Sequence, residues 1–350
     1  MEDTNGLLGL AKRKVNLEEI ARAAGVSRST VSLVLRGSAL IAPKTAVKVR
    51  EAATQLGYVY NRTAAALRNR KTHTIGLIEA NFKNPFFAAM SDWVERELDR
   101  KGKTLLFADS SESIEKQSKV IQLMLEHGVD GILICPVKGT TKEDLQILET
   151  SRVPFVLFSR YIPGWDTDYV GAANYSGAYH AVQRLIQLGH RRIVFVGGES
   201  STSAWFDRNR GFRNALAEEG LPIPEPASFL SEVSAAGGSA CVEAVLAMNP
   251  VPTAALCYSD TVAFGFMMGL EKRGIVIQRD FSVVGFDDLP EAKLWRPPLA
   301  TVACPPAKVG IEATHLLMER IEKGRSAPHR IEIEGTLIER ESMGKILKNT

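Results

Sequence analysis

Beyond His73 the chain alternates short apolar runs with longer amphipathic stretches. The runs TIGLIEA, KTLLFAD, DGILICP and VPFVLFS have the length of strands, and PFFAAMSDWVERELDRKG and SIEKQSKVIQLMLEHG have helical periodicity. A second series after Val170 contains a helical stretch over residues 175–188 and then RIVFVGG, GFRNALAEEG, TAALCYSD and FSVVGFDD. This alternation predicts parallel sheets that helices cover on both faces. Two such series predict two lobes, with a ligand pocket at the carboxyl ends of the strands in the cleft between them.

The first part of the chain has a different pattern, with short amphipathic helices and no strand. Asn16 and Glu19 have the spacing of a capping box, which predicts a helix that begins directly after Asn16 and ends at Gly25. Ser27 is predicted to cap a second helix, and a third is predicted over residues 43–56. Two helices joined by so short a glycine turn predict a helix-turn-helix.

A helix-turn-helix places the first residues of its second helix against base edges in the major groove of DNA. Here those residues are Arg28 and Ser29, while Thr30 and Ser32 are placed to contact the flanking phosphates. Helical hairpins with a glycine turn also occur in enzymes, so the motif alone leaves DNA binding as a hypothesis.

The charge distribution favours DNA binding by this part of the chain. The net charge is only +3, yet residues 1–72 hold 13 Lys and Arg against 5 Asp and Glu, and the remainder holds 30 against 35. A basic head on a mildly acidic body indicates a polyanionic partner for the head alone.

Composition excludes several other classes of protein. Apolar residues make up 45% of the chain and charged residues 24%, which is typical of a globular protein. The apolar runs are far shorter than the ~20 residues that span a bilayer, and the N-terminus lacks the order of a secretory signal, so we expect a cytoplasmic protein without a membrane segment. The four cysteines are scattered, and no Gly-rich phosphate loop follows a strand, so neither a metal nor a cofactor is expected.

The segments TVSLVLRG, LGYVYNRTAAALR, KNPFFAA, SVVGFDD and PPLATV resemble the lactose-repressor (LacI/GalR-type) family of transcription regulators, and the resemblance covers nearly the whole chain. VSLVL is similar to the maltose-regulon repressor branch. The resemblance implies an α + α/β fold in which a helix-turn-helix head and a hinge helix precede a two-lobed body like the periplasmic sugar-binding proteins. It also implies a homodimer, or a tetramer, that binds a palindromic double-stranded operator as a repressor and responds to a small sugar or sugar derivative.

The sequence patterns together with this resemblance imply the expected domain organisation. It consists of a basic N-terminal extension over residues 1–14, a helix-turn-helix domain over 15–60, a hinge helix and linker over 61–72, and an effector-binding and dimerisation body over 73–350. The first lobe is expected over about 73–172 and 302–332, and the second over about 173–301 and 333–345. The helices over residues 86–100 and 118–127 are expected to pack against a twin subunit, the alternative being ordinary burial against the sheet.

The hinge expectation comes from the resemblance. In that family the segment that corresponds to residues 61–68 orders on operator DNA, and the leucine that corresponds to Leu67 wedges into the minor groove. Small alanines and flanking arginines suit this role, although an alanine-rich linker is the alternative. Leu33 departs from the arginine that many members carry, and we expect it to contact a thymine methyl. The predicted DNA contacts are Ser27, Arg28, Ser29, Thr30, Ser32, Leu33, Asn61, Arg62, Ala64, Leu67 and Arg68.

The predicted effector site lies at the ends of several strands, where polar and aromatic side chains suit a polyhydroxylated ligand. Its residues are Asn84, Phe86, Phe87, Arg160, Arg208, Ser259 and Asp287. Three of these side-chain assignments have an alternative to ligand contact: Asn84 caps a helix, one of the two phenylalanines belongs to the core, and Arg208 is a surface charge.

Ser159, Ala173 and Ser259 replace acceptors that relatives often carry, so the ligand presents fewer hydroxyls or carries a phosphate or carboxylate for the two arginines. Of the pair Asp287 and Asp288, one is expected to contact the ligand and the other to cap a helix.

Two other functions compete with a repressor. A sugar-binding protein without DNA function would need no basic head. A sugar-phosphate enzyme is disfavoured because the six histidines are scattered and no nucleophile motif such as G-x-S-x-G is present.

Overall fold

The computed structural model describes residues 15–35, 38, 40–58, 72–324 and 327–346. The chain forms two compact units, Met1–Thr72 and His73–Thr350, here called the head and the body. The predicted hinge contacts Asn61, Arg62, Ala64, Leu67 and Arg68 lie outside the described residues.

The described part of the head is a bundle of three helices, α1 (Leu17–Ala24), α2 (Arg28–Leu35) and α3 (Pro43–Gln55). The predicted capping box is present: the side-chain oxygen of Asn16 accepts from the amide of Glu19 at 3.0 Å, and the Glu19 carboxylate accepts from the amide of Asn16 at 2.9 Å. Gly25 ends α1 with a φ of 65°, a left-handed conformation that glycine adopts without strain. The fully buried Ile20, Val31 and Val49 join the three helices in one small core.

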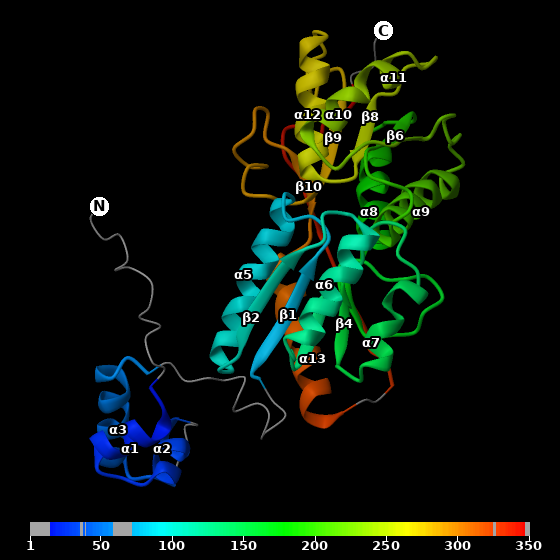
Figure 1. The fold of residues 1–350 in the computed structure, drawn as a ribbon. Coiled ribbons are helices and arrows are strands. Elements are labelled where there is room, and N and C mark those ends of the chain that lie inside the picture. Colours follow the sequence, from blue (N-terminus) through cyan, green and yellow to red (C-terminus); the bar gives the residue numbers. More distant parts are fainter. Residues whose placement is uncertain (1–14, 36–37, 39, 59–71, 325–326, 347–350) are drawn as a thin grey trace, which may run out of the picture. The chain divides into compact units, whose positions relative to one another are not determined.

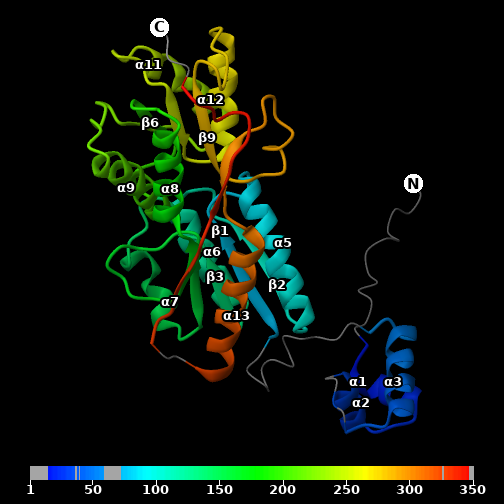
Figure 2. The same ribbon diagram turned by 180° about the vertical axis from the view of Figure 1, so that it is seen from behind.

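The body contains two six-stranded sheets, one in each lobe (Figures 1 and 2). The first sheet has the order β11-β5-β4-β3-β1-β2, and its strand pairs are parallel. Its strands are β1 (Thr74–Glu79), β2 (Thr104–Asp109), β3 (Gly131–Ile134), β4 (Phe155–Phe158), β5 (Tyr169–Ala172) and β11 (Arg330–Ile333).

The second sheet has the order β12-β10-β9-β8-β6-β7, and it is parallel except that β12 runs antiparallel to β10. Its strands are β6 (Ile193–Val196), β7 (Ser228–Phe229), β8 (Ala254–Cys257), β9 (Ser282–Asp287), β10 (Ala300–Ala303) and β12 (Thr336–Ile338).

Helices cover both faces of each sheet, as the sequence predicts. They are α5 (Pro85–Arg100), α6 (Ile114–Glu126), the 3-10 turn η1 (Glu143–Leu145), α7 (Gln146–Thr150), α8 (Asn174–Gln187), α9 (Ser203–Glu218), α10 (Ala235–Ala240), α11 (Val242–Leu246), α12 (Asp260–Lys272) and α13 (Pro306–Lys323). Neighbouring residues of a strand therefore enter different cores: Leu77 packs on the side of α5 and α13, and Ile78 packs on the side of α6 and α7. This double burial explains why the strands read as continuous apolar runs.

The chain passes between the lobes three times, after β5, after β10 and after β11 (Figure 2). The carboxyl ends of the parallel strands in both sheets meet the space between the lobes. Among the described residues, no helix is long and apolar enough to cross a membrane.

Candidate functional site

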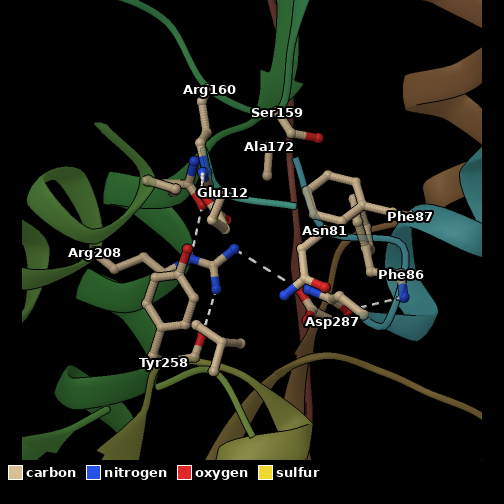
Figure 3. A pocket seen from close by; sticks show the side chains of 14 residues that line it. Asn81, Phe86, Phe87, Glu112, Ser159, Arg160, Ala172, Arg208, Tyr258 and Asp287 are labelled. Atoms are coloured by element: carbon tan, nitrogen blue, oxygen red, sulfur yellow. Dashed lines mark hydrogen bonds and ion pairs between the residues drawn. The ribbon is translucent and has the colours of Figure 1, made fainter. Parts of the chain in front are cut away.

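A cavity with an empty volume of about 570 Å³, open to solvent, lies between the lobes at the carboxyl ends of the strands (Figure 3). Both lobes supply its walls. In the first lobe, lining side chains follow β1, β2 and β4 or lie at the start of α5; in the second, they lie on α9, follow β8 or end β9. Six of the seven predicted effector contacts line it: Asn84, Phe86, Phe87, Arg160, Arg208 and Asp287.

Arg160 is paired with a carboxylate from the same lobe. It follows β4, is 8% exposed, and donates to Glu112 from two nitrogens at 2.8 and 3.0 Å and to the carbonyl of Pro136 at 3.2 Å. Glu112 lies in the loop after β2 and accepts the amide of Lys138 at 3.0 Å as well. Such a bidentate pair is strong and fixes both side chains in one orientation.

Arg208 on α9 is held by partners of its own lobe. Its Nε donates to the side-chain oxygen of Asn174 at 2.8 Å, another nitrogen donates to the carbonyl of Tyr258, and a third lies 3.7 Å from Asp287. The guanidinium also stacks over the ring of Phe286 at 3.6 Å. Arg208 is 7% exposed, so the alternative of a surface charge does not hold.

Asp287, the last residue of β9, has an unusual backbone conformation and a buried carboxyl. Its φ is 115°, outside the regions that side-chain-bearing residues ordinarily adopt, and it is 7% exposed. Burial raises the pKa of Asp287 to about 7, an effect that the nearby Arg208 partly offsets. A carboxyl of this kind binds a pair of ligand hydroxyls as acceptor, and in its protonated form as donor.

The aromatic wall of the cavity comes from the start of α5. Asn84 caps this helix by accepting the amide of Phe86 at 3.0 Å, and it also lines the cavity, so the capping and ligand-contact expectations apply together. Phe86 and Phe87 are 8% and 5% exposed, and both line the cavity while belonging to the core. Sequence reasoning missed Asn81, Glu112 and Tyr258 as lining residues, although each stands in the polar stretch that follows a strand.

Ser259 does not line the cavity, which corrects its predicted place in the effector site. It is 1% exposed, and its hydroxyl accepts the amide of Val262 at 3.4 Å as the cap of α12. The side chain turns into the helix because capping satisfies an amide that would otherwise be buried without a partner, and the preceding Tyr258 faces the cavity instead. Ser159 does line the cavity, and in the described part of the chain its buried hydroxyl has no hydrogen-bond partner.

Asp288 does not cap a helix, which corrects the expectation for that pair of acids. Its carboxylate accepts from Arg340 at 2.6 Å. The turn that follows is held by Asp260, which accepts the amide of Leu289 at 2.7 Å.

Hydrogen bonds and an ion pair join the lobes beside the cavity. The amide of Tyr161 donates to the hydroxyl of Ser203 at 2.9 Å, and the ammonium of Lys138 lies 2.9 Å from the carboxylate of Glu199. The hydroxyl of Tyr161 also bonds a carboxylate of α9 at 2.9 Å. A second space with an empty volume of about 510 Å³ adjoins these contacts and shares Arg160 with the first cavity.

The predicted DNA-contacting residues of the head that the structure describes are Ser27, directly before α2, and residues of α2 from Arg28 to Leu33. Ser27, Arg28 and Ser29 are exposed, whereas Thr30, Ser32 and Leu33 are half-buried. The hydroxyl of Ser27 accepts the amide of Thr30 at 3.1 Å, so it caps α2 as predicted. The Arg28 side chain is 60% exposed and lies 3.7 Å from Glu18, a weak surface pair that leaves it accessible.

No candidate metal site is found in the described part of the chain. It contains no group of three His, Cys, Asp or Glu side chains that could hold a metal ion. All four cysteines are free and buried.

Comparison with known proteins gives two family matches. Residues 16–61 match the model of bacterial regulatory proteins of the lacI family, and residues 72–341 match the model of periplasmic binding proteins and the sugar-binding domain of the LacI family. The HTH-type transcriptional repressor PurR of Vibrio cholerae is 32% identical over 334 residues, which are 95% of this chain and 99% of that protein. The ribose operon repressor of Haemophilus influenzae is 30% identical over 327 residues, 93% of this chain and 98% of that protein.

Comparison with solved structures gives matches to regulators of the same kind over nearly the whole chain. The complex of the transcriptional regulator CelR with cellobiose has a TM-score of 0.71 and 31% identity, and the match covers 94% of this chain and all 100% of that one. The Lac repressor dimer bound to operator and an anti-inducer has a TM-score of 0.85 over 95% of this chain and 100% of that one, and at 24% identity it supports the fold alone. With the helix-turn-helix head, the two-lobed body and the cleft between the lobes, these matches show that the chain belongs to the LacI family of bacterial transcription regulators.

Proposed function

We propose that the protein is a cytoplasmic repressor that binds a palindromic operator as a homodimer and changes its DNA affinity when a small polyhydroxylated effector occupies the cavity. The observation that carries this proposal is that one chain joins an exposed, basic helix-turn-helix to a two-lobed body whose cleft is lined by paired charges and aromatic rings. Relatives across nearly the full length are repressors. The effector is bound and released unchanged.

The proposed DNA contacts come from the start of α2 and from the hinge segment. Arg28 and Ser29 read base edges, Thr30 and Ser32 support the contact with phosphates, and Leu33 meets a thymine methyl. Two copies of the head would read the two halves of an inverted repeat. Leu67 of each copy would wedge into the central minor-groove step.

The proposed domain division follows the two sheets. The head ends before His73, and the first lobe comprises residues 73–172 and 302–332. The second lobe comprises residues 173–301 and 333–345. Strand β5 ends at Ala172 in the first sheet, β10 ends at Ala303 in the second, and β11 ends at Ile333 in the first. Each end lies within two residues of the corresponding limit, which supports the limits as approximate boundaries.

An exposed aromatic pair supports dimerisation through the first lobe. Phe82 and Phe107 are 52% and 38% exposed, and their ring centroids are 5.1 Å apart at the edge strand β2, beside the start of α5. Leu123 on α6 is 44% exposed. Large exposed apolar side chains that contact each other, as Phe82 and Phe107 do, are typical of an interface.

The effector acts only if its affinity differs between the two states of the body. The cavity is built from both lobes, so a ligand held by Arg160 on one side and Asp287 on the other stabilises one relative position of the lobes. A coupling free energy of about 1–3 kcal/mol is usual for such regulators.

The experiment that tests the proposed function is a selection of genomic fragments by the purified protein at physiological salt, followed by footprinting of the enriched fragments. The expected result is an inverted repeat with a distorted central step. Enrichment without an inverted repeat, or no enrichment with and without added cell metabolites, contradicts the proposal. Retention on DNA must also weaken as salt rises, because phosphate contacts release counterions.

A further inference from the structure

The charged side chains around the cavity occur in pairs of opposite sign. Arg160 is bonded to Glu112, Arg208 lies against Asp287, and Lys138 at the adjoining small void pairs with Glu199. The first two pairs line the main cavity, and each partner in them is at least three-quarters buried at its side chain. The cavity therefore has no net charge when these groups are ionised.

The pair of Arg160 and Glu112 occupies the place where an acidic ligand would bind. Arg160 uses three of its five N–H groups on Glu112 and on the carbonyl of Pro136. A ligand carboxylate or phosphate needs the same planar fork, and it would meet the negative charge of Glu112 at close range in a partly desolvated site. Ligand hydroxyls meet no such conflict, because they can donate to Glu112 or Asp287 without displacing either arginine.

The backbone forces Glu112 into this position. Ser111 and Glu112 have φ values of 51° and 54°, so two consecutive residues with side chains adopt the left-handed conformation. The amide of Glu112 donates to the carbonyl of Ala80 at 2.7 Å, and Asp109 accepts from both the amide and the hydroxyl of Ser111, at 3.1 and 2.6 Å. An unfavourable conformation fixed by so many bonds is typical of a functional site.

We propose that Glu112 determines the charge of the effector: by filling the guanidinium fork of Arg160 it restricts the cavity to uncharged polyhydroxylated ligands. Removal of the Glu112 carboxylate opens the fork to carboxylates and phosphates. This inference rests on the proposed role of the cavity as the effector site. Of the two ligand classes that the sequence leaves open, it excludes the one that carries a phosphate or carboxylate.

The test measures inorganic phosphate binding to the full-length protein by isothermal titration calorimetry in a buffer of fixed chloride concentration. Glu112→Gln keeps the size of the side chain and removes its charge, and it is expected to bind phosphate at least tenfold more tightly than the wild type. Glu322→Gln is the matched control, because Glu322 is an exposed acid near the end of α13, and it is expected to behave as the wild type. The double variant Glu112→Gln/Arg160→Met is expected to lose the gain.

Equal phosphate affinity of the wild type and Glu112→Gln overturns the inference, as does a gain that survives in the double variant. Circular dichroism and a thermal melt show whether each variant is folded, and Glu112→Ala replaces Glu112→Gln if the latter is not. The calorimetric readout contains no DNA. A failed operator selection with a positive phosphate result would therefore contradict the proposed function and leave the assignment of Glu112 standing.

Discussion

Tyr161 of the first lobe donates its hydroxyl to a carboxylate oxygen of Asp207 in the second lobe across 2.9 Å. The Tyr161 ring also lies beneath the guanidinium of Arg330, 4.0 Å from ring centroid to guanidinium carbon. Asp207 is 6% exposed, and burial raises the pKa of its carboxyl. The bond therefore links the lobes through a desolvated group beside the cavity, where a small change in energy alters the relative position of the lobes.

Tyr161→Phe is expected to loosen the lobes without unfolding either of them. Loss of a hydrogen bond to a charged group costs about 1.5–3 kcal/mol, which is roughly ten- to a hundredfold in the population of the open state. The amide of Gly139 reports this opening, because it donates to the carbonyl of Ser201 across the lobes at 3.4 Å. Hydrogen exchange of the Gly139 amide, followed by NMR, should accelerate by that factor, whereas the amides of Val137 and Lys138, which are bonded within the first lobe, should not change.

Tyr179→Phe is the control for this prediction, because its hydroxyl donates to Glu218 within the second lobe. Unchanged exchange in Tyr161→Phe would show that the interlobe hydrogen bond does not hold the lobes together.

The buried carboxyl of Asp287 is expected to make stability depend on pH. Burial raises its pKa from 3.8 to about 7, so between these values the folded chain binds more protons than the unfolded chain. The free energy of unfolding therefore falls as the pH rises from about 4 to about 7, by at most roughly 4 kcal/mol at about 1.4 kcal/mol per pKa unit. Asp260, whose pKa burial raises from 3.8 to about 8, adds a fall of the same sign.

Asp287→Asn should make this fall smaller, because asparagine does not titrate and has nearly the same size and shape as aspartate. Urea unfolding at pH 4.5, 6 and 7.5 measures the change. Asp166→Asn, at an exposed position, is the matched control and should follow the wild type. A pH profile of Asp287→Asn parallel to that of the wild type would assign the dependence to other groups.

Local signals in the sequence are sufficient to predict the helices in the described part of the head. The capping box of Asn16 and Glu19 involves residues three apart, and the glycine that ends α1 acts through its own φ, so both could be predicted without the tertiary fold. In the body, Arg160 and Asp287 could be placed because parallel strands bring their carboxyl ends to one edge. Helix α9 begins at Ser203, earlier than its apolar pattern predicted, because Arg208 and its neighbours are buried through polar contacts.

The rest of the site depends on long-range geometry. Glu112 reaches the cavity only because two residues adopt positive φ and because its partner lies 48 positions further along the chain. The periodicity of apolar residues predicts neither the positive φ values nor a partner so distant in the sequence. The prediction that Ser259 contacts the ligand is wrong for a local reason. A serine directly before a helix can hydrogen-bond either to a ligand or to an amide of the first helical turn, and here it accepts the amide of Val262.

The pair of Arg320 and Asp168 is expected to be important for the stability of the first lobe. Arg320 of α13 is 4% exposed and donates to the two carboxylate oxygens of Asp168 at 2.7 and 2.8 Å, and Asp168 also accepts the amide of His329 at 2.8 Å. Asp168→Ala leaves a buried guanidinium without this carboxylate and should lower the free energy of unfolding by about 3 kcal/mol. Urea unfolding measures the loss.

The double variant Asp168→Ala/Arg320→Met should recover part of it, since it removes the stranded charge as well. Glu319→Ala, which breaks the more exposed pair with Lys323 on the same helix, should change stability by less than about 1 kcal/mol. A double variant no more stable than Asp168→Ala would show that the loss comes from the His329 contact rather than from the stranded charge.

Arg28→Ala is expected to reduce sequence discrimination by the head more than it reduces DNA affinity in general. A guanidinium that reads a base edge is worth about 1–3 kcal/mol for the correct base and much less on other sequences. Folding should be unaffected, because the contact of Arg28 with Glu18 is 3.7 Å long and both side chains are more than half exposed. Fluorescence anisotropy with the selected operator and a scrambled duplex, at two salt concentrations, separates the two effects.

Arg50→Ala is the control variant, because it removes one positive charge from the exposed side of α3. If Arg28→Ala weakens binding to both duplexes equally and lowers the salt dependence, Arg28 contacts a phosphate and the bases must be read by other residues of α2.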